Sequence, residues 1–178
     1  QYNDGSDVQY GSDPPAFGIQ LLQGPVIDSP GDTAYHYRGS FFGTDTILDK
    51  KNLVMTSYMP YEKNPMPPLS IPEDSLQARL AQVGGLDKFG STIDPSTWGT
   101  GGTAVSDPNF AFHGDPVAGS GWLDANSRDR RQLLNCGPFQ LAAGDTQDIL
   151  CAYVLGRGTD ALDGISVMRQ NARAALQH

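Results

Sequence analysis

Glycine and proline divide this chain into short apolar runs, and that division limits the possible folds more than any other feature. The 178 residues include 21 glycines and 13 prolines. Glycine favours turns, and proline ends helices and central strands, so the pattern is typical of short strands joined by many turns. The length suits one domain with a sizeable core. We therefore expect residues 1–178 to form a single mainly β domain, or a fragment or processed piece of a larger secreted protein.

The apolar runs have the character of antiparallel strands. Aromatic and β-branched residues are concentrated in AFGIQLLQGPVI (16–27), DTAYHYRGSFFG (32–43), KNLVMTSYMPY (51–61), NFAFHG (109–114), DRRQLLNCGPFQL (129–141) and TQDILCAYVLG (146–156). The last two segments are the strongest, and they flank the turn-like AAGD at 142–145, which predicts a hairpin. Together the segments predict a sandwich-like antiparallel β domain with long irregular loops.

Two segments have helical periodicity instead. The first, at about 70–84, begins with Ser70 and Glu73 in capping-box spacing. The second, at about 162–177, has Asp163 in the position of an N-cap. Each carries an apolar stripe, formed by Leu76, Leu80 and Val83 in the first and by Ile165, Met168, Ala172 and Leu176 in the second. We expect both helices to pack on the flank or end of the β domain.

The segment GRGTDA at 156–161 matches the G-x-G-x-x-A pattern of a dinucleotide-binding turn. That pattern needs a parallel βαβ unit, whereas the strand before it is expected in an antiparallel hairpin. The chain also lacks the alternation of strands and helices that such a fold requires. We therefore interpret the segment as a glycine-rich turn from strand to helix, and we expect no organic cofactor.

Several longer phrases, taken in order, resemble one family. They are PPAFGIQLLQGPV, KNLVMTSYMPY, GDPVAGSGWLD and DRRQLLNCGPFQLAAGDTQDILCAYVLGRGTD, within roughly residues 14–177. Together they resemble a region of large secreted proteins of Bacteroidota and related phyla, which precedes fibronectin-like modules and a type IX secretion sorting domain. The resemblance implies a β-rich protein that is secreted or held at the cell surface. It implies no catalytic residue.

Charge and hydropathy exclude two classes of partner. The formal net charge is −8, so the chain lacks the basic surface that nucleic acid requires. No run approaches the ~18 apolar residues of a membrane-spanning helix. We expect neither a nucleic-acid partner nor a membrane span.

The two cysteines, Cys136 and Cys151, lie in the two strongest strand segments. A hairpin that turns between Ala143 and Gly144 sets them opposite each other, within about 5 Å. The same register sets Phe139 against an aspartate, and a shift by one residue separates the cysteines. A disulfide is the favoured interpretation in an exported protein, and two buried free thiols are the alternative.

Two acidic loops are candidates for calcium, because calcium takes several closely spaced carboxylate and amide oxygens. The candidate ligands are Asp4 and Asp7 near the amino end, and Asp124, Asn126 and Asp129 after the second tryptophan. Neither loop has EF-hand spacing. Carboxylates in such loops more often cap turns or face solvent.

Some aromatic residues could stack against a sugar. Trp98 and Trp122 are the better candidates because they lie in glycine-rich loops, and Tyr35, Tyr37, Phe110 and Phe112 are further candidates. The alternative is that most of these rings are anchors of the core. No histidine spacing typical of zinc sites is present.

These features favour a non-catalytic structural, adhesive or assembly module of an exported or cell-surface protein. Its expected partners are neighbouring modules or other subunits, including copies of itself. The first alternative is a glycan-binding module. The second is an extracellular hydrolase with its site in loops 86–129, so an enzyme is the less favoured class.

Overall fold

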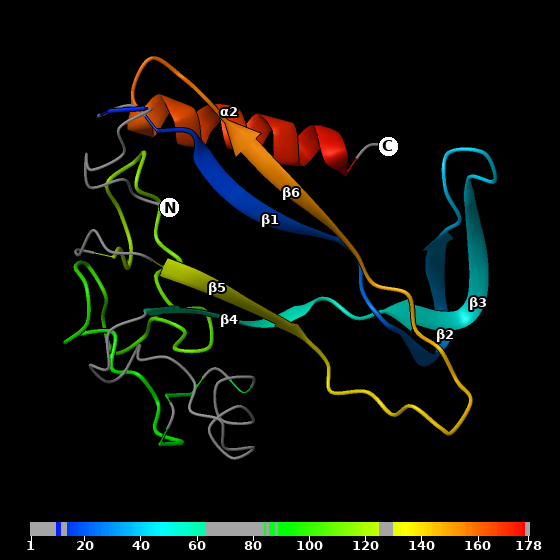
Figure 1. The fold of residues 1–178 in the computed structure, drawn as a ribbon. Coiled ribbons are helices and arrows are strands. Elements are labelled where there is room, and N and C mark those ends of the chain that lie inside the picture. The colour runs from blue at the N-terminus through cyan, green and yellow to red at the C-terminus, as the bar shows by residue number, and fades with distance from the viewer. Residues whose placement is uncertain are drawn as a thin grey trace.

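The structure, a computed structural model, describes residues 10–11, 14–62, 84, 86–87, 89–124 and 130–176 (Figure 1). Its elements are β1 (Ala16–Gln23), β2 (Val26–Tyr37), β3 (Thr44–Asn52), β4 (Met55–Glu62), β5 (Arg130–Cys136), β6 (Leu150–Gly156) and α2 (Ala161–Ala175). The prediction of a mainly β, antiparallel fold is confirmed. The helix predicted at about 70–84 lies outside the described residues, apart from its last position.

The six strands form three two-stranded antiparallel sheets, which pair β1 with β6, β2 with β3, and β4 with β5. A sandwich needs two broader sheets packed face to face, so the sandwich prediction is not confirmed within the described residues. The hairpin predicted between β5 and β6 is wrong. Proline cannot donate a ladder hydrogen bond, so Pro138, two residues after β5, interrupts any such pairing. Residues 137–149 instead form an open connection (Figure 1).

The three sheets meet where two turns of the chain cross. The turn from β1 to β2 contains Gly24 and Pro25, and the turn from β3 to β4 contains Leu53. Leu53 N donates to Pro25 O at 2.7 Å. A Cβ atom on Gly24 would lie only 1.9 Å from the carbonyl oxygen of Leu53. Only glycine allows the two main chains to approach so closely.

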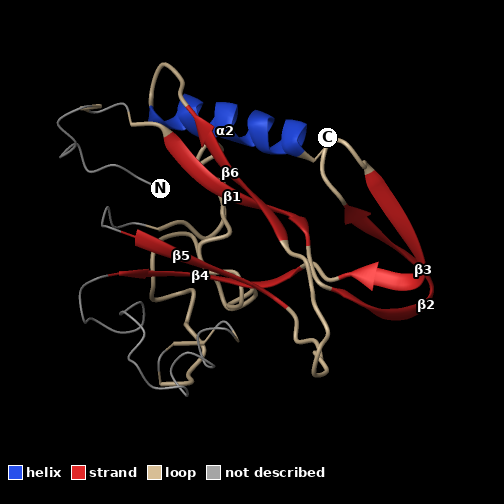
Figure 2. Ribbon diagram, turned by 45° about the vertical axis from the view of Figure 1, so that its right-hand side comes forward, coloured by secondary structure: helices blue, strands red, loops and turns tan. Residues whose placement is uncertain are grey.

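Helix α2 covers one face of the β1–β6 sheet (Figure 2). A Cβ on Gly156 would lie 2.1 Å from Met168 N, and one on Gly18 would lie 2.7 Å from Met168 Sδ. The glycine of the GRGTDA segment therefore lets the helix main chain approach the strand. Because β6 pairs antiparallel with β1, the interpretation of this segment as a packing turn is supported.

The N-cap of α2 is Asp160, so the prediction of Asp163 is wrong. Asp160 Oδ1 accepts hydrogen bonds from Leu162 N and Asp163 N, both at 2.9 Å. Asp163 lies in the first turn and accepts from Thr159 N at 2.9 Å. Both residues are aspartates near the helix start, and only their main-chain conformation decides which one caps.

The segment 89–124 folds around a small core against β4. The core consists of Met59, Ile93, Ala111 and Trp122. Three aspartates in this segment are each followed by a proline, and each carboxylate accepts a hydrogen bond from the main-chain N–H of the residue two positions later. The three bonds, all 2.9 Å long, are Asp94 from Ser96, Asp107 from Asn109 and Asp115 from Val117. These carboxylates therefore stabilise turns in a segment that lacks long strands.

An ion pair joins this segment to α2. Arg169 Nη1 lies 2.9 Å from Asp115 Oδ1. The hydrogen bond from the guanidinium holds the pKa of the Asp115 carboxyl below its usual range, and the N–H groups of Ala118 and Val117 lower it further. The helix is thus held both to the β1–β6 sheet and to the loops.

We expect Asp160→Ala to lower the free energy of unfolding by about 1 kcal/mol, because two N–H groups of the first helical turn lose their acceptor. For a chain of this length that corresponds to a fall of about 2–4 °C in Tm by calorimetry. Asp160→Asn is the matched control, since asparagine retains the acceptor oxygen. Equal losses in both variants would contradict the assignment of the cap.

Candidate functional site

The β2–β3 ribbon folds back on itself and forms one wall of a recess. Its register breaks between Asp28 and Thr33. Asp49 opposite the break has a positive φ of 56°, and its Oδ1 accepts from Gly31 N at 2.9 Å. This corner brings the second half of β2 back beside the end of β1, as the contacts of Asn52 and Gln23 below demonstrate.

The recess lies between this ribbon, the adjoining ends of β1 and β6, and the end of α2, and has a volume of about 410 Å³. Its apolar walls come from Leu22, Tyr35, Tyr37, Leu150, Ala175 and Leu176, and its polar lining from Gln23, Thr44 and Asn52. We call it the aromatic recess. Figures 1 and 2 both show the C-terminal end of α2 on the side of the molecule where the β2–β3 turn lies.

The side chain of Asn52 holds the main chain of Tyr35. Asn52 Oδ1 accepts from Tyr35 N at 2.8 Å, and Asn52 Nδ2 donates to Tyr35 O at 2.9 Å. The same amide donates to Gly24 O at 3.3 Å. The amide thus makes the two hydrogen bonds that a neighbouring strand would make. Tyr35 is fixed relative to the crossing of the turns.

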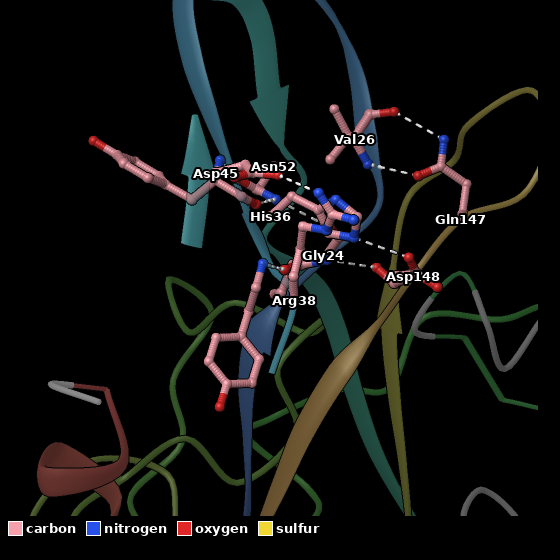
Figure 3. Close-up of polar contacts among 11 residues, drawn as sticks. Gly24, Val26, His36, Arg38, Asp45, Asn52, Gln147 and Asp148 are labelled. Atoms are coloured by element: carbon pink, nitrogen blue, oxygen red, sulfur yellow. Dashed lines mark hydrogen bonds and ion pairs between the residues drawn. The ribbon is translucent and has the colours of Figure 1, made fainter. Parts of the chain in front are cut away.

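The side chain of Gln23 holds Tyr37 through the N–H group alone. Gln23 Oε1 accepts from Tyr37 N at 2.7 Å, and its Nε2 donates to Asp148 O at 3.1 Å. The connection 137–149 is in turn held to β2 by Gln147, whose amide bonds Val26 N at 2.8 Å and Val26 O at 3.0 Å (Figure 3). These hydrogen bonds hold the β2 wall of the recess to β1 and to the connection 137–149.

His36 adds a side-chain contact between β2 and this connection. Its Nε2 lies 2.9 Å from Asp148 Oδ2 (Figure 3). His36 lies between Tyr35 and Tyr37, so its side chain leaves the opposite face of the strand. The pair therefore supports the two tyrosines without facing the recess.

The recess is lined mainly by apolar and aromatic groups. The described lining contains no carboxyl, imidazole or thiol, and its hydroxyl groups belong to Tyr35, Tyr37 and Thr44. The amides of Gln23 and Asn52 are engaged within the protein. A ligand would therefore meet mainly tyrosine rings and leucine side chains.

Two phenylalanines stand exposed beside the recess. The turn 38–43 joins Tyr37 to Thr44, both of which line the recess, and carries Phe41 and Phe42 at its tip. The turn is closed by hydrogen bonds from Arg38 N to Gly43 O at 2.8 Å and from Gly43 N to Gly39 O at 2.9 Å. We call Phe41 and Phe42 the aromatic tip.

The aromatic tip is ordered by contacts of its own. The two phenyl rings lie edge to face at 5.1 Å. The Arg38 guanidinium lies 5.7 Å from the centre of the Phe42 ring and 3.1 Å from Asp45. Exposed apolar side chains that form a contiguous patch often mark a binding surface.

The tryptophans proposed as sugar platforms belong to the core. Trp122 is 0% exposed, and its Nε1 donates to Trp98 O. Its ring packs against Phe112 at 5.0 Å and against His113 at 6.0 Å. Trp98 is partly buried against the same cluster. The prediction of a ligand contact through Trp122 is wrong, because a fully enclosed ring offers no face to a sugar.

We expect Trp122→Ala to cost about 3–5 kcal/mol in the free energy of unfolding, as a large cavity replaces the ring. The corresponding fall in Tm is about 10 °C, measured by circular dichroism. Trp98→Ala is the control and should cost less, because its ring is only partly buried. A Trp122 variant with unchanged Tm would contradict the core assignment.

The two cysteines are free thiols in the structure and lie in different sheets. Cys136 is opposite Met55 of β4, and Cys151 is opposite Leu21 of β1. Burial raises the pKa of the Cys136 thiol, and the charge of Cys151 raises it further. A bridge would therefore join two sheets and would not staple a hairpin. The disulfide stays a prediction.

We expect the protein to contain this disulfide when it folds in an oxidising environment, and its intact mass to rise by two hydrogens on reduction. Closure of a loop of about 15 residues adds about 3 kcal/mol in the chain-entropy model. The oxidised chain should therefore melt at a higher temperature than Cys136→Ser/Cys151→Ser. Free thiols of the native protein should be alkylated before reduction. If reduction then leaves the mass unchanged, the bridge is contradicted.

The calcium candidates are mostly beyond what the structure describes. Asp124 is exposed, whereas Asp4, Asp7, Asn126 and Asp129 lie outside the described residues. Within the described part of the chain, no group of three or more histidine, cysteine or acidic side chains could hold a metal ion. Calcium binding stays a prediction.

The sequence indicates part of the site. It presents Tyr35 and Tyr37 as possible binding residues, but it does not single out the aromatic tip or the supporting amides of Gln23 and Asn52. The signal for the tip was RGSFFG at 38–43. Two consecutive phenylalanines between glycines of a tight turn have little neighbouring chain to cover them.

Comparison of the chain with protein-family models, with curated proteins and with solved structures gave no match. The resemblance to a region of secreted Bacteroidota proteins therefore stays a prediction from the sequence phrases. No helix among the described residues is long and apolar enough to cross a membrane.

Proposed function

We propose that the chain is a non-catalytic assembly or adhesion module of an exported or cell-surface protein. The observation that supports this function best is the aromatic recess with the aromatic tip beside it. The two together offer a contiguous apolar surface on a ribbon whose main chain is held by Asn52 and Gln23. A surface that is rigid before binding loses less conformational entropy when a partner covers it.

The chemistry of the recess favours a protein partner over a glycan. A sugar forms hydrogen bonds through its hydroxyl groups, and the amides of Gln23 and Asn52 already bond the main chain, which leaves the hydroxyl groups of Tyr35, Tyr37 and Thr44 in the lining. An apolar side chain of a protein has no such requirement. Export and a place at the cell surface are part of this proposal and rest on the sequence resemblance.

The hydrolase alternative has less support. The aspartates at 94, 107 and 115 each accept turn N–H groups in the structure. A pair of carboxylates for acid–base catalysis would have to face one another across a cleft. The calcium prediction is compatible with the proposed function, since surface loops often hold calcium in exported modules.

The proposal is tested by a photo-crosslinking residue in place of Phe42 in the protein as its host exports it. We expect light-dependent adducts to another polypeptide chain, of the same or a different kind, on protein found outside the cell or on its surface. The same residue in place of Val105, which is also exposed, is the matched control.

Two outcomes would overturn the proposal. One is equal adducts, or none, from positions 42 and 105. The other is retention of the protein inside the cell. Binding on a glycan array that is lost in Tyr35→Ala would support the lectin alternative.

A further inference from the structure

We propose that two copies of this chain bind each other through a two-fold symmetric contact in which the aromatic tip of each copy enters the aromatic recess of the other. The inference rests on the proposed function and names its partner. It starts from the position of the tip. The turn that carries Phe41 and Phe42 leaves the recess wall at Tyr37 and rejoins it at Thr44.

The tip and the recess match in size and in chemistry. A cavity of about 150 Å³ with apolar walls accommodates one benzene ring. The recess has about 410 Å³, which is room for the two phenyl rings of a neighbouring tip. Tyr35 and Tyr37 provide ring faces and edges against which phenyl rings pack favourably.

The arrangement also determines the symmetry of the complex. The tip and the recess lie next to each other, so one partner copy can fill the recess and receive the tip at the same time. Such a contact is isologous and closes as a two-fold symmetric pair. Had they lain on opposite sides of the molecule, the same contact would have produced an open chain of copies. We therefore expect a dimer and no filament from this contact.

The available area sets the strength of the pair. Phe41, Phe42, Tyr35 and Tyr37 are 90%, 68%, 58% and 37% exposed. With about 200 Å² for each aromatic side chain, they would bury about 500 Å² per copy. Leu176, which is 56% exposed at the rim, adds to this area. The total is near the lower end of stable interfaces, about 1,200 Å², so the dimer should be weak and reversible.

The net charge of the two copies opposes dimerisation and makes it depend on salt concentration. The recess lining is uncharged, and Arg38 at the tip is paired with Asp45. Each copy nevertheless has a net charge of −8, so two copies repel each other at low salt. Screening weakens that repulsion and leaves the apolar contact intact. Dimerisation should therefore strengthen as salt is added.

Sedimentation equilibrium of the full chain over a range of concentrations tests the pair. The reduced protein should be used, so that intermolecular disulfides do not contribute. We expect a monomer–dimer equilibrium whose dissociation constant falls with added sodium chloride. Phe41→Ser/Phe42→Ser should raise that constant by at least about tenfold, which corresponds to about 1.4 kcal/mol. Val105→Ser, at another exposed apolar position, should leave it unchanged.

A mixing experiment separates this contact from general stickiness. Ala175→Trp places a ring in the recess while it leaves the tip intact, and Leu176→Trp is a second variant of the same kind. The tip variant and the recess variant should each dimerise more weakly than the unmodified chain, because neither can form a tip–recess contact with itself. A heterodimer of the two variants forms one of the two contacts, so their mixture should associate more tightly than either variant alone and more weakly than the unmodified chain.

The outcomes distinguish this inference from the function on which it rests. The two-fold contact is overturned if the tip variant self-associates as tightly as the unmodified chain, or if the mixture associates no more tightly than either variant alone. If position 42 still crosslinks to a different protein, the assembly function stands without it. A chain that is monomeric at every concentration and forms no crosslink overturns both.

Discussion

The close crossing of two main chains at Gly24 and Leu53 is the constraint on which the rest of the structure depends. It joins the β1–β6, β2–β3 and β4–β5 sheets, none of which shares a strand with another. Two-stranded sheets are marginal by themselves, so their stability must come from contacts between them and from α2. A side chain at position 24 would force the turns apart and separate all three.

Side-chain amides extend this crossing into the site. Asn52 bonds both the N–H and the carbonyl of Tyr35 as a further strand would, and Gln23 accepts from the N–H of Tyr37. The fold thereby keeps one edge of β2 paired while it leaves the two tyrosine rings beside an open recess. Asn52 and Gln23 therefore hold the main chain of the site in place without covering the rings of Tyr35 and Tyr37.

Local features of the fold could be predicted from the sequence, because they depend on neighbouring residues. The mainly β character and the C-terminal helix follow from apolar periodicity, and the turn between β6 and α2 follows from the glycines of GRGTDA. Pairing between strands could not be predicted. β5 and β6 are adjacent in sequence, yet each pairs with a strand from the first third of the chain.

The candidate site shows the same division. Glycines on either side of Phe41 and Phe42 indicate a turn with exposed rings, but nothing near them in the sequence specifies what lies beside that turn. The end of α2, about 130 residues later, forms the other wall of the recess. For Trp122 the local sequence is misleading. Its glycine-rich loop suggests an exposed ring, but the fold encloses the ring completely.

The sequence by itself determined the mainly β class of fold, the start of the last helix to within three residues and the net charge of −8, because periodicity, turn chemistry and charge can be read from nearby residues. The tertiary structure decided which strands pair, which aspartate caps the helix, which aromatic rings are buried and where the recess lies. Those outcomes depend on contacts between residues far apart in the chain, whose free energies no local pattern records.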